Sequence, residues 1–380
     1  MKFTVFHVDG ERGLRGGERQ LLYLAAALRA RGHDNVVCCR HGDALDGEAR
    51  GQGFETLGLP FHFEFDPRSA WLLARAARRP HPIIHAHTAH ALGIAAISQL
   101  FGGPAIVAHR RVDFPLRGSL SRLKYRRAGR LVAVSQAIAR VLETGGIPGS
   151  LVTVIHDAMP VSAEEWSWVG IDPPPFAVAD PERRHQARRA LAESFGLDLA
   201  KAWVGNLAAL EPRKDHDTLI RAAGRVLDQR PDTLFLIAGR GPEQERLEAA
   251  IKHRGLEGKV VLLGHQDDPA LVLAALDVFV LSSQGEGMGS VLLEAAATGV
   301  AIAATNVGGI PEVIEHEFTG LLAPAHDESA LAACILRLLD DPGLARRLAA
   351  AGLAALSRFG LGAAAERFEK IYEGLSRASR

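Results

Sequence analysis

Residues 259–305 decide the fold and read KVVLLGHQDDPALVLAALDVFVLSSQGEGMGSVLLEAAATGVAIAAT. Three short apolar runs, KVVLLG, DVFVLS and VAIAAT, alternate here with longer stretches of helical periodicity. Such runs are typical of parallel strands that are covered by helices on both faces of a sheet. The stretch therefore predicts an α/β fold.

The same alternation covers both halves of the chain, from KFTVFHV near the N-terminus to TGLLAP. It breaks down between Met159 and Asp198, where three consecutive prolines and a charge run indicate a connection between domains. The chain has 380 residues, more than the roughly 250–300 at which a single core stops growing. We therefore expect two Rossmann-like, doubly wound domains, at residues 1–165 and 199–360, joined by a linker at 166–198 and facing a central cleft.

The composition excludes several classes of protein. Lys and Arg together number 44, as do Asp and Glu, so the chain lacks the global positive field of a general nucleic-acid binder. Three cysteines cannot build a disulfide framework, which fits a reducing cytoplasm. No apolar run approaches the ~20 residues of a membrane span. We expect a cytoplasmic protein that binds anions only locally and does not bind nucleic acid.

A glycine pair, Gly16 and Gly17, follows the first strand and directly precedes a helix that begins near Glu18. Glycines at this position let backbone amides approach a phosphate at the positive end of a helix. An ordinary turn is the alternative. The segment is not a G-x-G-x-x-G fingerprint, so it does not predict a nicotinamide or flavin cofactor.

Two histidines, His85 and His87, lie on one face at the end of the apolar strand PIIHAH. Paired imidazoles can bind a metal, but this segment supplies no third ligand, and neutral imidazoles can equally bind a sugar hydroxyl. We expect no metal, a structural role for His85 and a functional role for His87, which is nearer the strand tip.

The main basic segment of the chain is HRRVDFPLRGSLSRLKYRRAGR, residues 109–130, with eight Arg or Lys against the single acidic residue Asp113. It could form a surface for an anionic acceptor or for membrane lipid, or simply a solvated helix face. The candidate surface residues are Arg110, Arg111, Arg117, Arg122, Lys124, Arg126 and Arg127.

In the second half, Arg213 and Lys214 lie in the loop that leaves a strand and enters a helix. Two cations beside free backbone amides suit a diphosphate, although a solvated helix start would look the same.

The richest segment is SSQGEGMGSVLLEAAATG, in which Glu286 occupies a glycine-rich loop and Glu294 follows on a helix. Gly287 and Gly289 allow backbone amides to approach a ligand. Eight helical residues span ~12 Å, so both carboxylates can bind hydroxyl groups in one cleft. They are not obviously placed for a glycoside hydrolase, whose two carboxyls flank one bond at ~5–9 Å.

These segments, in this order, resemble glycosyltransferase family 4, the retaining nucleotide-sugar transferases with the GT-B fold. The resemblance rests on GGERQ, HAH, VGNLAALEPRKDHDTLIRA, AGRGPE and EGMGSVLLEAAATGVAIAATNVGGIPEVI with its E-x7-E pair. It implies that a terminal helix at residues 361–380 crosses back onto the N-terminal domain.

The resemblance also implies roles for single residues. Lys214, with Arg213, would neutralise the departing diphosphate, Glu286 would hold the sugar hydroxyls, Glu294 would bind the ribose, and His87 would lie near the donor sugar. His87, Lys214 and Glu286 are then the catalytic candidates. The implied donor-binding set is Gly16, Gly17, Arg213, Lys214, Glu286, Gly287, Met288, Gly289, Ser290 and Glu294.

The chain departs from the family pattern at two places. Asn206 occupies a position at which family members often carry arginine, so phosphate binding depends more on Lys214 and Arg213. The loop VIHDAMPV lacks the common N-G-hydrophobic-D pattern, which puts the hinge geometry in doubt.

The function implied by the resemblance is retaining transfer of a sugar from a UDP- or GDP-linked donor to a hydroxyl of a glycan, a glycolipid or a small molecule, without a cofactor or a metal. We expect such an enzyme to work in the cytoplasm, and at the inner face of the cell membrane if its basic segment binds anionic lipid. Two alternatives share the fold: a nucleotide-sugar epimerase or hydrolase, and a non-catalytic module that binds sugar nucleotides.

Overall fold

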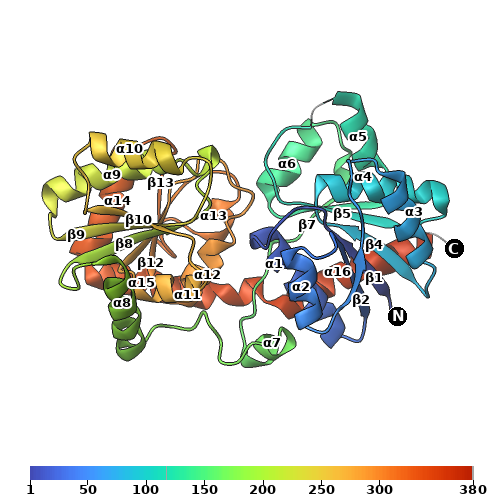
Figure 1. Ribbon diagram of the computed structural model, residues 1–380, viewed down its shortest axis with the longest axis horizontal. Coiled ribbons are helices and arrows are strands. Elements are labelled where there is room, and N and C mark those ends of the chain that lie inside the picture. The colour runs from blue at the N-terminus through green and yellow to red at the C-terminus, as the bar shows by residue number, and fades with distance from the viewer. Residues whose placement is uncertain (117, 379–380) are drawn as a thin grey trace. The chain divides into compact units, whose positions relative to one another are not determined.

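The computed structural model describes residues 1–116 and 118–378, which divide into two compact units (Figure 1). Unit 1 comprises residues 1–173 together with the C-terminal segment that begins at Arg358, and unit 2 comprises residues 174–357. Each unit contains one parallel sheet with helices on both faces, so the α/β prediction is confirmed.

The described residues of unit 1 form a seven-stranded sheet in the order β3-β2-β1-β4-β5-β6-β7, with every pair parallel. The strands are β1 (Thr4–Val8), β2 (Asp34–Cys39), β3 (Glu55–Gly58), β4 (Pro82–Ala86), β5 (Ile106–Arg110), β6 (Arg130–Ala133) and β7 (Val152–Val154). The helices are α1 (Gly16–Ala30), α2 (Ala44–Gly51), α3 (Pro67–Ala76), α4 (Ala89–Ser98), η1 (Gln99–Phe101), α5 (Gly118–Arg126), α6 (Gln136–Thr144), η2 (Gly149–Leu151), α7 (Ala163–Trp168) and α16 (Leu361–Ala378).

The described residues of unit 2 form a six-stranded parallel sheet in the order β10-β9-β8-β11-β12-β13. The strands are β8 (Ala202–Leu207), β9 (Thr233–Ala238), β10 (Val260–Gly264), β11 (Val278–Leu281), β12 (Ala301–Thr305) and β13 (Leu321–Ala323). The helices are α8 (Pro181–Phe195), η3 (Pro212–Lys214), α9 (His216–Gln229), α10 (Gln244–His253), α11 (Pro269–Ala275), α12 (Val291–Ala297), α13 (Ile310–Val313), α14 (Glu328–Asp340), α15 (Pro342–Ala355) and η4 (Leu356–Phe359), the last of which runs into unit 1.

Both sheets are doubly wound, because the strand order reverses between β1 and β4 in unit 1 and between β8 and β11 in unit 2. In unit 2, α9, α10 and α14 cover one face, and α8, α11 and α12 cover the other (Figure 1). Ligands of open α/β sheets bind outside the carboxyl ends of the strands at such reversals. The loops after β8 and β11 are therefore the expected location of a ligand site in unit 2.

The expected linker at 166–198 is wrong in its extent. The division between the units falls at Pro173 and Pro174, and the charge run PERRHQARRALAESF forms the helix α8, which packs against α11. Asp180 caps α8, and its side chain accepts a hydrogen bond of 2.8 Å from the backbone N–H of Arg183. Only Ala187 and Leu191 of this helix are buried, which explains why its sequence resembles a solvated connection.

The C-terminal helix α16 packs against α1 within unit 1. The buried carboxylate of Glu165 accepts hydrogen bonds from the backbone N–H groups of Leu361 at 3.1 Å and of Gly362 at 2.8 Å. These are amides of the first helical turn, which lack partners inside a helix. Glu165 therefore fixes the start of α16 on this unit.

Candidate functional site

Lys214 and Glu286 meet at the carboxyl ends of β8 and β11 in unit 2. Lys214 ends the short 3-10 turn η3, and Glu286 lies in the loop between β11 and α12. The ammonium Nζ lies 2.5 Å from Oε2 of Glu286, and the two residues are only 8% and 7% exposed. The structure thus brings together the two residues that carry most of the predicted chemistry.

Two further polar groups face the Glu286 carboxylate. Ser283 donates a hydrogen bond of 3.1 Å from Oγ to Oε2, and Nη1 of Arg213 lies 3.9 Å from Oε1. Arg213 also donates from Nε to Glu211 at 3.0 Å. Glu286 is therefore held by one buried cation, one more exposed cation and one hydroxyl.

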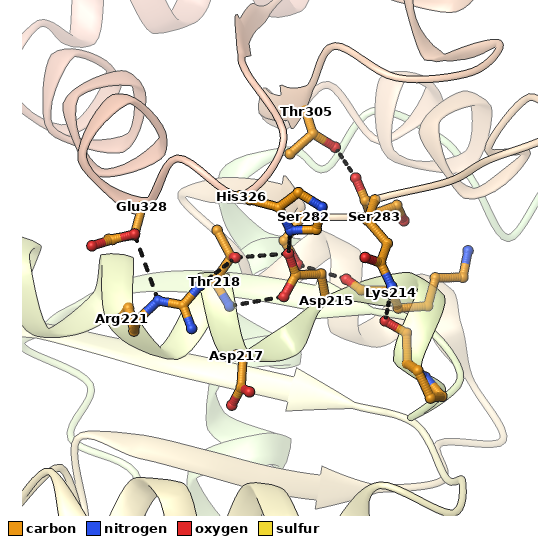
Figure 2. A network of polar contacts seen from close by, with 12 residues as sticks. Lys214, Asp215, Asp217, Thr218, Arg221, Ser282, Ser283, Thr305, His326 and Glu328 are labelled. Carbon is orange, nitrogen blue, oxygen red and sulfur yellow. Dashed lines mark hydrogen bonds and ion pairs between the residues drawn. The ribbon is translucent and has the colours of Figure 1, made fainter.

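Buried hydroxyl groups tie together the loops that carry these residues (Figure 2). Ser282 donates from Oγ to the backbone carbonyl of Lys214 at 2.9 Å, and Thr305 donates from Oγ1 to the carbonyl of Ser283 at 2.6 Å. These side chains are fully buried and link the ends of β8, β11 and β12. Neither hydroxyl was predicted to belong to the site, although each follows directly after an apolar run, DVFVL or VAIAA, in the sequence.

Asp215, the residue after Lys214, adopts a left-handed backbone conformation with φ of 46°. Its carboxylate caps α9, accepting hydrogen bonds from the backbone N–H of Thr218 at 3.2 Å and from its hydroxyl at 2.7 Å. Nδ1 of His326 lies 2.8 Å from the same carboxylate (Figure 2). This conformation costs a non-glycine residue roughly 1–2 kcal/mol. The cap and His326 hold the turn that presents Lys214.

The glycines of NVGG permit close backbone packing beside Glu286. A Cβ on Gly308, which has φ of 55°, would lie 1.9 Å from the backbone oxygen of Glu286, and Gly309 donates its N–H to that oxygen at 3.2 Å. Gly289, with φ of 81°, turns the chain into α12. Gly308 requires glycine because a side chain would displace the loop that carries Glu286, and Gly289 requires it because of its positive φ.

The other predicted donor-binding residues also belong to this loop and helix. Gly287, Met288 and Ser290 follow Glu286 directly, and the Met288 side chain is buried in the core. Glu294 lies in the first turn of α12 and is half-buried.

The Asn206 side chain forms hydrogen bonds within unit 2, and as a neutral amide it cannot supply the positive charge of the arginine that is common at this position. Its amide Nδ2 donates to the carbonyl of Val280 at 2.8 Å, and its Oδ1 lies 3.1 Å from Nε2 of His216. Burial, with a contribution from the nearby Lys214 ammonium, lowers the pKa of His216 to about 4. A neutral imidazole fits this position beside a cation.

In unit 1, α1 begins at Gly16, two residues before the expected start near Glu18, so Gly16 and Gly17 lie in its first turn. The carboxylate of Glu18 accepts a hydrogen bond of 2.8 Å from the backbone N–H of Arg15, the N-cap residue of α1. A Cβ on Gly17 would meet none of the described atoms within 4 Å, so packing does not explain this glycine.

His87 lies in a buried cluster with His7, His85 and His109. The rings of His85 and His87 are stacked at 4.3 Å, and Tyr372 of α16 lies 2.8 Å from Nδ1 of His85. Burial lowers the pKa of each of the four histidines, with a further contribution from the charge of Arg111. They are therefore neutral at neutral pH.

His7 is the third histidine that PIIHAH lacks. Potential ligand atoms of His7, His85 and His87 lie within 4.8 Å of one another, a spacing that could hold a metal ion. His7 was not predicted as a site residue because it is the only histidine in the strand KFTVFHV. Only the pairing of β1 with β4, in which His7 lies beside His85, brings it into the cluster.

The predicted basic surface is wrong at Arg110 and Lys124, which are both buried. Arg110 donates to the Tyr125 hydroxyl at 2.6 Å, and Lys124 binds the carbonyl of Ala89 at 2.8 Å and the carboxylate of Glu64. Arg110 and Lys124 therefore form hydrogen bonds and an ion pair inside unit 1, and their charges are not available to a ligand at the surface.

The remaining basic residues of the segment differ in exposure. Arg111 is mostly buried and pairs with Asp157 at 2.9 Å, so it is not a surface cation either. Arg122, Arg126 and Arg127 are exposed, whereas Arg117 lies outside the described residues.

A buried carboxyl, Asp9, follows β1 and was not identified from the sequence. Its Oδ1 accepts a hydrogen bond of 2.9 Å from the backbone N–H of Glu11, and burial raises its pKa from 3.8 to about 7. The folded state keeps this proton up to about neutral pH, whereas the unfolded chain releases it near pH 3.8. The contribution of Asp9 to the free energy of unfolding is therefore fully present below about pH 3.8 and is lost as the pH rises towards 7.

We expect Asp9→Asn to stabilise the protein at neutral and alkaline pH, because it removes the cost of ionising a buried carboxyl. The gain should reach about 2–4 kcal/mol at about pH 8 and nearly vanish at about pH 4. Melting temperatures of both proteins across this range measure it, with the exposed Asp34→Asn as the control. An equal gain at both ends of the range would contradict the assignment.

None of the helices in the described part of the chain combines the length and apolar character that a membrane span requires.

Comparison with known proteins places a family model on each unit. The model Glycosyltransferase Family 4 matches residues 14–162, and the model Glycosyl transferases group 1 matches residues 188–354. The chain is 34% identical to N-acetyl-alpha-D-glucosaminyl L-malate synthase of Bacillus anthracis over 42% of this chain and 41% of that protein. It is 32% identical to the lipopolysaccharide core biosynthesis mannosyltransferase LpsB of Rhizobium meliloti over 55% and 60%. The chain thus matches about half the length of these relatives.

Among solved structures, HepE of Anabaena in complex with UDP and glucose has the same fold. It superposes with a TM-score of 0.82 at 21% identity, over 98% of this chain and 99% of that chain. The two family models cover unit 1 and unit 2 in turn, and both sheets have the expected doubly wound topology. The chain therefore belongs to the GT-B glycosyltransferases of family 4.

Proposed function

We propose that this protein transfers a sugar from a nucleoside-diphosphate donor to a hydroxyl group of an acceptor, with retention of configuration and without a metal ion. The observation that carries the proposal is the buried contact of 2.5 Å between Lys214 and Glu286 at the strand ends of unit 2. A cation and a hydroxyl-binding carboxylate side by side suit the two halves of a sugar diphosphate. Family membership and the UDP and glucose bound to HepE support this class of donor.

The charge that develops in the transition state gives Lys214 and Glu286 different roles. Breaking the bond between C1 of the sugar and the phosphate oxygen leaves negative charge on the departing diphosphate, and a fixed ammonium beside it lowers the barrier. Lys214 supplies that ammonium, with Arg213 beside it. Glu286 pairs with Lys214 when no donor is bound and turns to the sugar hydroxyls when the diphosphate takes its place.

Retention follows if the acceptor oxygen attacks C1 on the face that the diphosphate leaves. The new bond joins that oxygen to C1, the bond from C1 to the phosphate oxygen breaks with its electron pair on phosphate, and the acceptor proton passes to the departing phosphate. No side chain need form a covalent intermediate. The amides of Gly17, Met288 and Gly289 are proposed to bind the donor, with the ribose at Glu294 and the sugar near His87.

Thermal-shift measurements in EDTA with UDP-glucose, GDP-mannose and ADP-glucose test the proposal directly. One donor should raise the melting temperature, because a ligand at a hundred times its Kd stabilises the folded state by about 2.7 kcal/mol. Lys214→Ala should lose most of that shift, whereas Arg122→Ala, at an exposed position, should keep it. A shift that required added Mg²⁺, or no shift with any donor, would contradict the proposal.

The acceptor is proposed to be a glycan or glycolipid of the cell envelope, following the lipopolysaccharide core named for LpsB, with a small molecule as the alternative. Exposed apolar side chains accompany the exposed basic residues around α5. These residues are Phe114, Leu120, Leu123, Arg122, Arg126 and Arg127. Such a combination suits peripheral contact with an anionic membrane at its cytoplasmic face.

Changing Arg122, Arg126 and Arg127 together to Gln tests the membrane contact. Each basic residue near an anionic surface contributes about 1 kcal/mol, so the variant should bind vesicles containing phosphatidylglycerol roughly a hundredfold more weakly. Co-sedimentation measures the binding, and vesicles of phosphatidylcholine alone are the control. Equal binding of both proteins to the anionic vesicles would exclude this surface.

A further inference from the structure

A chain of hydrogen bonds crosses the histidine cluster of unit 1. Nη1 of Arg111 lies 3.3 Å from Nδ1 of His87, and Nε2 of His87 lies 3.1 Å from Nδ1 of His7. Nε2 of His7 lies 2.9 Å from Oδ1 of Asn35, whose Nδ2 donates to the carbonyl of His33 at 3.0 Å. His7, His87 and Asn35 are buried, so their polar atoms depend on these contacts for hydrogen bonds.

Both ends of the chain fix its direction. A guanidinium only donates, so Nδ1 of His87 must accept from Arg111, and the single proton of the neutral ring lies on Nε2. At the other end, a backbone carbonyl only accepts, so the donating side of the Asn35 amide faces His33 and its oxygen accepts from His7. Each histidine then accepts at Nδ1 and donates at Nε2, and the two ends require the same direction independently.

The charge state of the rings agrees with this direction. Burial lowers the pKa of His7 to about 4 and that of His87 well below its ordinary value, and the Arg111 charge contributes to both. A protonated His87 would turn an N–H towards the guanidinium and another towards His7, and the first of these would have no acceptor.

A metal ion in the cluster would be incompatible with the chain. A metal bound between His7 and His87 would use the two facing nitrogens, so the His87 proton would have to move to Nδ1. There it would face the N–H of Arg111, which cannot accept it. The second ring nitrogen of a metal-bound histidine normally donates to an acceptor, which Arg111 cannot be.

We propose that Arg111, His7 and Asn35 are positioning residues that lock His87 in the tautomer with its proton on Nε2, so that Nδ1 is an acceptor for a substrate hydroxyl. The contact from Arg111 to Nδ1 is the longest of the chain, and a hydroxyl donor replaces it most easily. This role of His87 rests on the proposed function, whereas the tautomer does not depend on it.

Arg111 also supplies an internal comparison. Its Nη2 lies 3.1 Å from Nδ1 of His109, which must therefore accept, so the proton of the neutral His109 ring lies on Nε2. That nitrogen is buried and has no hydrogen-bond partner among the described residues. Loss of Arg111 should therefore disturb His87 and His109, whereas loss of Asn35 should disturb His7 and His87 but leave His109 unchanged.

Nitrogen-15 NMR of the whole protein, labelled at histidine, reads the tautomers at neutral pH. Single His→Gln variants assign the rings, and His7, His87 and His109 should each show a proton on Nε2. Asn35→Leu removes the acceptor at nearly constant volume and should alter the His7 and His87 signals. Arg111→Lys keeps a donor and should preserve the His87 tautomer. Arg122→Met, at an exposed position, should leave the signals of His7, His87 and His109 unchanged.

Kinetics separates this inference from the proposed function. For the donor that binds, Asn35→Leu should lower kcat at least tenfold while the donor KM changes less than threefold. A proton on Nδ1 of His87 in the unmodified protein, or zinc bound in stoichiometric amount at these rings, would overturn the tautomer assignment. Predicted tautomers with no binding of any donor would refute the proposed function alone. Donor turnover with an unchanged kcat in Asn35→Leu would refute the positioning role alone.

Discussion

Replacing Lys214 with alanine should lower kcat/KM at least ~10²-fold, since loss of one preorganised group that stabilises transition-state charge costs about 3–4 kcal/mol. The ammonium is buried, and its partner Glu286 lies 2.5 Å away, so solvent cannot supply an equivalent charge. The effect should fall on both the donor KM and kcat, because the ammonium binds the diphosphate of the intact donor and the charge on the diphosphate grows further as the bond breaks. Release of nucleoside diphosphate from the donor identified by thermal shift measures it.

Arg213→Ala is the matched control for this loop. The Arg213 side chain is more exposed than that of Lys214 and already pairs with Glu211 at 3.0 Å, so its loss should cost less than tenfold. Lys214→Ala also removes the buried cation that pairs with the Glu286 carboxylate, which is itself destabilising. The double variant Lys214→Ala with Glu286→Gln removes that unpaired charge, so it separates the cost in stability from the loss of catalysis. Near-normal turnover by folded Lys214→Ala would remove the role assigned to Lys214.

The second large effect is expected for Glu286→Gln, which should lower kcat/KM by roughly 10–100-fold. A hydrogen bond from a hydroxyl to a charged carboxylate contributes about 1.5–3 kcal/mol, and the neutral amide loses most of it. The donor-free protein should also melt at a lower temperature, because Lys214 loses its ion-pair partner. A bound diphosphate in contact with Lys214 should recover part of that loss.

Glu294→Gln is the comparison for this prediction. Glu294 lies on α12 and is proposed to contact the ribose, away from the bond that breaks, so its change should raise the donor KM more than it lowers kcat. Steady-state kinetics of the two variants with the same donor distinguishes the roles. The reverse pattern, with kcat lost in Glu294→Gln and kept in Glu286→Gln, would mean that the carboxylates are assigned the wrong way round.

The pairing of Lys214 with Glu286 could be anticipated because both residues follow parallel strands. The carboxyl ends of such strands lie at one edge of the sheet, and β8 is hydrogen-bonded directly to β11. The α/β class followed from the apolar runs for the same reason. The helix α8 could not be anticipated, because it buries few apolar residues and its charged sequence matches that of a solvated connection.

The histidine cluster depended on information that the local sequence does not hold. His7 and His85 are far apart in the chain and become neighbours only because β1 pairs with β4. Arg110 and Lys124 were assigned to the surface by their charge. The structure buries them because Tyr125 and Glu64 supply their partners. Long-range partners of this kind decide whether a charged residue serves the surface or the interior.

The central claim is that the Lys214 ammonium supports the departing diphosphate without a metal ion, and a single-turnover measurement of donor cleavage tests it most directly. The unmodified protein, stripped of metal and assayed in EDTA, should cleave the donor at the same rate as in Mg²⁺. Lys214→Ala should be slower by at least ~10²-fold in both. A rate that collapses in EDTA and returns with Mg²⁺ in the unmodified protein would contradict the account.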